Sequence, residues 1–190
     1  KKKHWSFYGN VRYNAEGLGG IDRGAWTTYL EPNYAFNDNL SVFLGLELQR
    51  NPDWAIWDRD THRLVTYGSE QALLNAGAVW LIGSKQELRV RLEALGLDAE
   101  AKRAWTVAAD GTPVRNHDPI ESFALRNLGF QVRYRYEFAP LSYLYLAYVR
   151  GGSLFGRGSG AYSVGDEFSD AFDLRDSEQL LVKLSYRFEI

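Results

Sequence analysis

Leu128-Gly129-Phe130-Gln131-Val132-Arg133-Tyr134-Arg135-Tyr136-Glu137-Phe138 is the stretch that decides the fold class. Every second residue is aliphatic or aromatic, and the residues between them are glycine, polar or charged. Side chains on a strand alternate between its two faces, so this segment has one apolar and one charged face. A helix would scatter the same residues around its circumference, so the period of two predicts a strand. The same alternation returns at 180–190.

Six further segments outside this stretch carry the alternation, which gives eight predicted strands. The eight predicted strands cover 4–14, 26–36, 40–57, 62–83, 88–94, 128–138, 143–152 and 180–190. Short turns are expected at 37–39, 84–85 and 139–142, a polar turn at 58–61, and long loops at 17–24, 98–119 and 151–177. Pro32 cannot donate to a strand ladder, so a bulge or an irregular strand end is expected there.

An even strand count, with short turns at one rim and mostly longer loops at the other, is typical of outer-membrane barrels. We therefore predict an all-β fold: an antiparallel up-and-down transmembrane β-barrel with eight strands in this chain. These strands either close alone or belong to a larger barrel. Residues 1–190 are expected to form a single domain of that barrel or its C-terminal segment.

Composition narrows the classes of function. The net charge of −2 gives no basic bias toward nucleic acid, and the absence of cysteine excludes disulfides and thiolate metal sites. No run approaches the roughly 20 apolar residues of a membrane-spanning helix. Lys1-Lys2-Lys3-His4 is not followed by an apolar segment, so no signal peptide is expected. The absence of methionine indicates a mature chain or a segment of one.

The position of the aromatic residues indicates which face meets lipid. They gather beside the short turns, and the same faces carry Leu, Val and Ala further away, as in an aromatic belt above an aliphatic band. The predicted belt comprises Trp5, Phe7, Tyr34, Phe36, Trp80, Tyr136, Phe138, Tyr186 and Phe188. The predicted lumen charges are Arg12, Glu31, Glu47, Arg89, Arg91, Glu93, Arg133, Arg135, Glu137, Lys183, Arg187 and Glu189. The expected partner is therefore the lipid bilayer of a Gram-negative outer membrane.

The segment Phe123-Ala124-Leu125-Arg126-Asn127 with the stretch that follows it to Ser142, and then Leu144-Tyr145-Leu146-Ala147-Tyr148, resembles the C-terminal barrel of the DUF5916 proteins. Phe172-Asp173-Leu174 and the residues from Leu181 to Phe188 also fit that family. Its members typically join a domain similar to family 9 carbohydrate-binding modules to a larger outer-membrane barrel, and no such module is visible here. The resemblance implies that further strands, or another chain, complete a larger barrel. It implies no catalytic residue.

Two interpretations of the lumen charges remain open. In a barrel of eight strands they fill the interior as an ion-pair network, because such a barrel has room for side chains only. In a wider barrel Arg89, Arg91, Arg133 and Arg135 line a pore that favours anions. Passive passage or surface binding without chemistry is the function that we expect, with no cofactor.

Three other possibilities are weaker. His62 near Asp58 and Asp60, or His117 beside Asp118, would supply the base of a rim hydrolase or acyltransferase, but no nucleophile motif accompanies them. A soluble lipocalin-like barrel would turn its apolar face inward. The acidic residues Asp166, Glu167, Asp170, Asp173 and Asp176 offer oxygen ligands for calcium, although their spacing fits no EF-hand loop.

Overall fold

A single antiparallel sheet makes up most of the computed structural model, which describes residues 4–18, 21–158 and 162–188. The strands follow one another in the order β1 (His4–Leu18), β2 (Ile21–Asn37), β3 (Leu40–Asp58), β4 (Arg63–Ile82), β5 (Gln86–Val107), β7 (Ser122–Ala139), β8 (Ser142–Gly158) and β9 (Ser177–Ser185). The short β6 (Pro113–Asn116) pairs with the end of β5 away from the short turns, and the helix α1 (Val164–Ala171) precedes β9. We call the strand ends on that side of the sheet the outer ends. No described helix is long and apolar enough to cross a bilayer.

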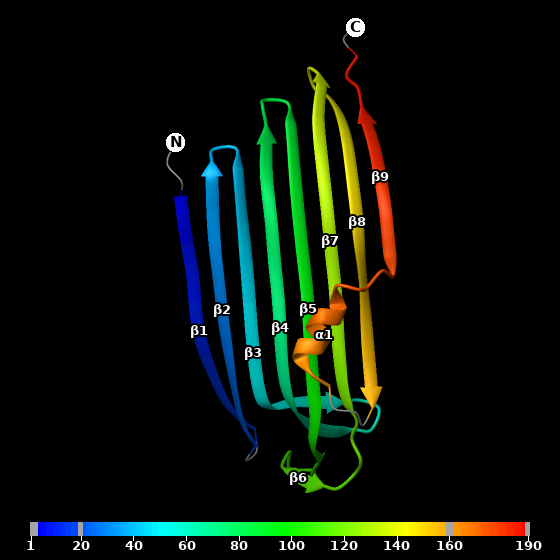
Figure 1. The fold of residues 1–190 in the computed structure, drawn as a ribbon. Helices are drawn as coiled ribbons and strands as arrows, with labels where there is room; N and C mark the ends of the chain where they lie inside the picture. The colour runs from blue at the N-terminus through cyan, green and yellow to red at the C-terminus, as the bar shows by residue number, and fades with distance from the viewer. Residues whose placement is uncertain (1–3, 19–20, 159–161, 189–190) are drawn as a thin grey trace.

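The up-and-down antiparallel arrangement confirms the predicted all-β class. The prediction of eight strands is wrong by one, because β6 forms within the predicted loop at 98–119. The sheet is also not closed: β1 and β9 lie at opposite edges, far apart in the ribbon view (Figure 1).

Most of the predicted long loops are strand extensions. In the predicted loop at 17–24, Gly17 and Leu18 of β1 pair with Asp22 and Ile21 of β2, and β5 continues to Val107 before a short loop. Strand β8 extends to Gly158, and α1 occupies part of the predicted loop at 151–177. The prediction fails here because backbone ladders continue through glycine and polar residues once the neighbouring strand is in register, even where hydrophobic alternation has lapsed.

The predicted bulge at Pro32 is also wrong. Pro32 pairs with Phe7 of β1, and the register toward β3 is the same on both sides of it, at Leu30↔Leu46 and Asn33↔Phe43. The missing N–H therefore interrupts the ladder without inserting a residue. The register shift in this pair of strands lies at Ala35/Asn37, beside the tight turn.

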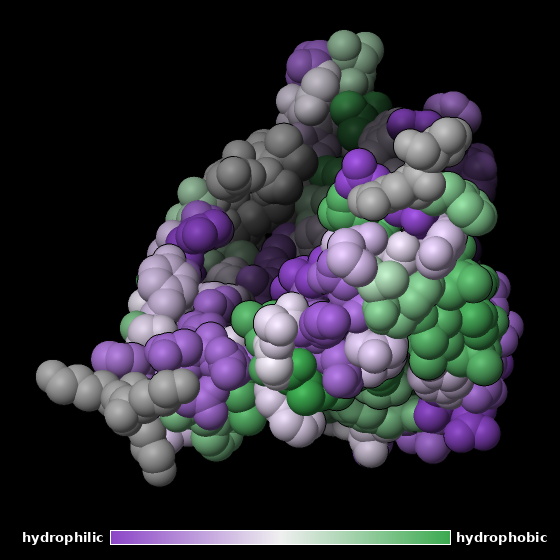
Figure 2. Space-filling view, turned by 90° about the horizontal axis from the view of Figure 1, so that it is seen from above, coloured by the Kyte–Doolittle hydropathy of each residue, from purple (hydrophilic) through white to green (hydrophobic). Residues whose placement is uncertain are grey.

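Cross-strand register sorts the side chains into two faces. On what we call the charged face, Arg91 of β5 lies between Gly77 of β4 and Gln131 of β7. On the apolar face, Leu92 lies between Ala76 and Phe130. A pocket of about 610 Å³ on the charged face is lined by residues of β2, β3, β4, β5, β7 and β8, so this face is concave. The space-filling view from above shows the hollow with hydrophilic residues along it (Figure 2).

The outer ends of β3 and β4 bend sideways and cross the lower parts of β5 and β7 (Figure 1). A bulge between Asn51 and Trp54 marks the bend in β3. Trp54 and Tyr67 of the bent hairpin then lie against Phe123 of β7, with ring centroids 6.0 and 5.0 Å apart. Val65 and Thr66 of β4 are almost completely buried at this end of the sheet, and most of the buried hydrophobic residues lie here.

Candidate functional site

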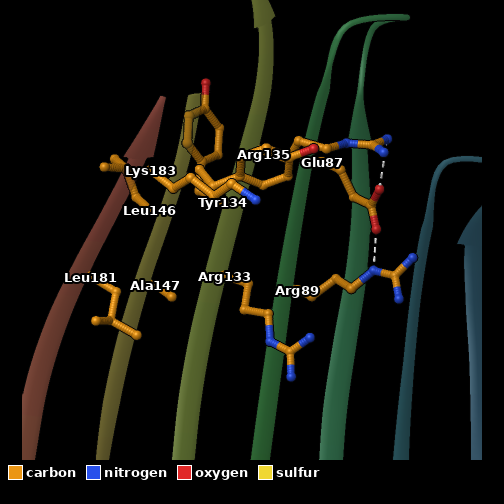
Figure 3. A pocket seen from close by; sticks show the side chains of 10 residues that line it. Glu87, Arg89, Arg133, Tyr134, Arg135, Leu146, Ala147, Leu181 and Lys183 are labelled. Carbon is orange, nitrogen blue, oxygen red and sulfur yellow. Dashed lines mark hydrogen bonds and ion pairs between the residues drawn. The ribbon is translucent and has the colours of Figure 1, made fainter. Parts of the chain in front are cut away.

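A cluster of cations surrounds one carboxylate on the charged face, near the short turns. Glu87 is buried, and its two carboxylate oxygens bind Arg89 and Arg135, the second at 2.9 Å. Arg133 donates from Nε to Gln131 at 2.8 Å. Figure 3 shows Glu87 and the three arginines on neighbouring strands, from the side opposite to Figure 1, so that β9 is now on the left.

Aromatic rings hold the cations of this cluster in place. The guanidinium of Arg135 lies 5.7 Å from the Tyr143 ring centroid, and the Lys183 ammonium lies 5.7 Å from that of Tyr145. Such contacts stabilise a cation without neutralising its charge. The pocket bounded by this cluster has a volume of about 400 Å³.

The middle of the charged face is less basic. Arg91 stacks over Phe43 at 4.7 Å, and the Glu31 carboxylate accepts from the Tyr29 hydroxyl and, at 3.0 Å, from the Asn33 amide. These contacts join β5 to β3 and fix the β2 side chains along the concave surface. The predicted ion-pair network is therefore partial in the described structure, with Arg91 and Glu31 held by a ring and by neutral groups.

The remaining predicted lumen charges take different positions. Register places Arg12, Glu47, Glu93, Glu137 and Lys183 on the charged face, and Glu137 also accepts from the backbone N–H of Leu141 at the short turn. Arg187 lies beyond the end of β9, where its N–H donates to Ser142. Glu189 lies outside the described residues.

The predicted aromatic belt lies on the apolar face or beside it. Trp5 contacts Tyr34, which contacts Phe36, with ring centroids 4.3 and 4.5 Å apart. At the other edge Phe138 stacks on Tyr186. Phe7, Trp80 and Tyr136 lie on the same face by register, and Phe188 follows Tyr186 with a T-shaped ring contact at 4.8 Å. Seven of these nine rings are exposed, from Phe138 at 36% to Phe188 at 79%, whereas Tyr34 and Tyr136 are half-buried.

A row of charges, which the sequence analysis missed, ends the apolar face on six strands. Moving away from the short turns, the first charged residue on that face is Arg50, Glu70, Asp98, Arg126, Arg150 or Glu178 on β3, β4, β5, β7, β8 and β9. We call this row the charged collar. Within it Arg50 pairs with Glu70 at 3.2 Å. The signal was present in the sequence as one charged residue interrupting each apolar alternation.

Helix α1 docks on the apolar side of the sheet at the collar. Arg126 binds Asp170 at 2.6 Å and Glu167 at 3.7 Å, and Phe168 lies directly over Gly96. Arg150 donates to the carbonyls of Phe172 and Leu174, at 2.7 and 3.1 Å. The acidic segment proposed as a calcium site thus uses Glu167 and Asp170 to hold the helix.

Asp98 is the most perturbed group of the collar. Burial, and then the nearby charge of Glu70, raise the pKa of its carboxyl to about 6. Glu100 of the same strand and Glu167 of α1 add to that rise. The docked helix therefore brings a carboxylate toward one that already resists ionisation.

The histidine candidates at the rim do not assemble a catalytic group in the described residues. His62 sits in the β3–β4 turn with its ring against Trp57, and Asp118 pairs with Arg63 at 3.1 Å. Asp58 accepts from the Thr61 hydroxyl, which lowers the pKa of its carboxyl. Among the residues that the structure describes, no group of three or more His, Asp or Glu side chains is placed to hold a metal ion.

Comparison with known proteins identifies no relative: no family model, curated protein or solved structure matches the chain. The resemblance to the DUF5916 proteins stays a prediction.

Proposed function

We propose that this chain is a wall of an outer-membrane β-barrel, and that its concave charged face lines a passive route for small polar solutes. The observation that supports this most directly is the separation of the two faces. The apolar face carries Leu, Val and Ala between an aromatic belt and the charged collar, while the other face carries Arg89, Arg91, Arg133 and Arg135 at the same levels. A large exposed apolar surface on a sheet calls for an apolar solvent or partner.

The height of the apolar band supports a bilayer as that solvent. From Leu40 to Arg50 the chain of β3 advances about 33 Å. With the tilt of about 40° usual in membrane barrels, this corresponds to a band about 25 Å high. Apart from α1 at the outer end, no described helix or strand packs on this face. The collar and α1 would then lie at the outer interface, where charges remain hydrated.

Passage is preferred to a filled interior because the concave face leaves space. Pockets of about 400 and 610 Å³ lie along it, between side chains that an eight-stranded barrel would press together. In line with the resemblance to the DUF5916 proteins, we propose that further strands or another chain complete a wider barrel in a Gram-negative outer membrane.

Conductance across a planar bilayer tests this function. The chain is refolded in detergent, inserted into the bilayer, and its insertion is checked by co-flotation with lipid vesicles. We expect discrete conductance steps. Inserted protein that stays silent at all voltages would overturn passive passage, and a chain that remains a soluble monomer in buffer would overturn membrane insertion as well.

A further inference from the structure

We propose that Arg89, Arg133 and Lys183 form a binding site for a small oxyanion with two or more negative charges, of the phosphate or diphosphate type. The inference rests on the proposed function, since it names the class of solute that the charged face would select. It is carried by three features of the pocket near the short turns: its charge balance, its register and its shape.

The charge balance leaves positive charge unneutralised. The pocket is lined by four cations, Arg89, Arg133, Arg135 and Lys183, and by one carboxylate, Glu87. Both oxygens of Glu87 are already bound, one by Arg89 and one by Arg135. The partner found for Arg133 is the neutral Gln131, and that for Lys183 is the Tyr145 ring. These exposed cations are hydrated, and a multiply charged anion that bound between them would replace water with charge-assisted hydrogen bonds.

The register adds a specific repulsion. Arg89 and Arg133 are direct cross-strand partners between β5 and β7. Like charges directly opposite each other destabilise a sheet, whereas an anion held between them converts the repulsion into attraction. Guanidinium groups present paired N–H donors that match the paired oxygens of a phosphate or carboxylate. A halide is a single spherical acceptor and cannot use both donors in this way.

The shape gives the anion a place. Next to Arg133 in the same row come Ala147 of β8 and Leu181 of β9, so a small side chain follows a long one. Tyr145 and Lys183 form the adjoining wall, and the volume of this open pocket is about 400 Å³. A pocket of this size accommodates a small solute with a few convergent polar groups.

The test uses inorganic pyrophosphate and the refolded chain in neutral detergent micelles, with sodium chloride at matched ionic strength as the reference. Binding is measured by calorimetry and by the shift of the unfolding temperature. Wild type is expected to bind pyrophosphate and to unfold at a higher temperature in its presence. Arg133→Gln is expected to bind at least tenfold more weakly, as the loss of a charge-assisted hydrogen bond implies.

Two further variants separate a site from a general charge effect. Arg115→Gln removes one exposed charge from β6, away from the pocket, and is expected to bind like wild type. Glu87→Gln frees Arg89 and Arg135 for the ligand and is expected to bind more tightly. Without pyrophosphate, Arg133→Gln should unfold at a higher temperature than wild type, because the cross-strand repulsion is gone. This last readout also shows that the variant is folded.

The outcomes distinguish the site from the pore. Equal binding by wild type and Arg133→Gln, or weaker binding by Glu87→Gln, overturns the oxyanion site even if conductance is observed. Conversely, specific binding by a chain that conducts nothing leaves the site standing and overturns passive passage. Anionic phospholipid added to the micelles tests the source of the phosphate: competition with pyrophosphate would assign the site to a lipid headgroup, and lack of competition to a soluble solute.

Discussion

Adjacent residues of one strand experience opposite surroundings, and this gives the sharpest test of orientation. Val132 lies at the centre of the apolar band on β7, and Gln131 beside it lies on the charged face. In vesicles, Val132→Arg is expected to lower the free energy of unfolding by about 2–4 kcal/mol, the cost of an arginine at the bilayer midplane. Gln131→Arg, the matched control, should cost far less: it loses the contact with Arg133 and faces Arg91, but both effects lie on the hydrated face. Urea titration of both variants in vesicles measures the difference, and equal costs would contradict a lipid-facing Val132.

Asp98 makes stability depend on pH. Its carboxyl has a pKa of about 6 in the folded protein against about 3.8 unfolded, so between these values the native state holds a proton that the unfolded chain has released. The free energy of unfolding therefore falls as pH rises from about 4 to about 6, and then stays low. Asp98→Asn removes this effect: relative to wild type it should be neutral near pH 4 and stabilising by about 1 kcal/mol near pH 7, a value reduced for partial exposure.

Denaturant titration of wild type and Asp98→Asn at the two pH values measures this change. Asp110 provides the opposite control, because hydrogen bonds from Thr112 lower the pKa of its carboxyl. Asp110→Asn should therefore lose stability relative to wild type only above the range in which that carboxyl ionises. If Asp98→Asn changed the free energy of unfolding equally at pH 4 and pH 7, the carboxyl of Asp98 would not have a raised pKa in the folded protein.

At the scale of elements, the docking of α1 depends on one glycine. A Cβ added at Gly96 would lie 2.4 Å from the backbone nitrogen of Phe168, so Gly96→Ala must displace the helix. Amide hydrogen exchange across Val164–Ala171 is expected to accelerate by roughly tenfold or more, because the free energy of local opening falls. Gly129→Ala is the matched control, because a Cβ there meets no atom within 4 Å. Unchanged exchange in Gly96→Ala would mean that α1 is not held at this position.

The elements also show which parts of the fold a sequence can reveal. Period-two alternation located the inner halves of the strands, such as 128–138 within β7, because burial against lipid or core imposes it directly. It also located β3 and β4 almost to their ends, but it missed the second half of β5, which continues through Asp98, Glu100 and Lys102. There pairing depends on the neighbouring strand, which lies far away in sequence.

The site divides in the same way. Alternation assigned Arg89 and Arg133 to one face, but their direct opposition and the saturation of Glu87 depend on the register between β5 and β7. Helix α1 was missed because Val164–Ala171 is short and acidic, and the groups that hold it, such as Arg126 and Gly96, lie on distant strands.

At the scale of the whole molecule, the proposed function requires that the two open edges of the sheet find pairing partners. Strands β1 and β9 each have one neighbour in the sheet, so one row of backbone groups on each is unpaired within it. Within hydrocarbon every such group costs several kcal/mol, so both edges must find partners before the sheet can span a bilayer. Either the edges pair with each other, which gives eight strands around a filled interior, or they pair with strands outside this sheet.

The absence of native cysteine allows these two closures to be told apart. Val11 of β1 and Val182 of β9 both lie on the apolar face at opposite edges. Because a passage needs more than eight strands, Val11→Cys/Val182→Cys is expected to give no disulfide within one chain in membranes. If β1 of one chain pairs with β9 of another, the double variant forms disulfides between chains and neither single variant does. Val90→Cys, at the same face but in the interior of the sheet, should form neither. An intrachain disulfide in the double variant, seen as faster migration without reductant, would mean that the eight strands close alone. The arginines would then fill the barrel instead of lining a route through it.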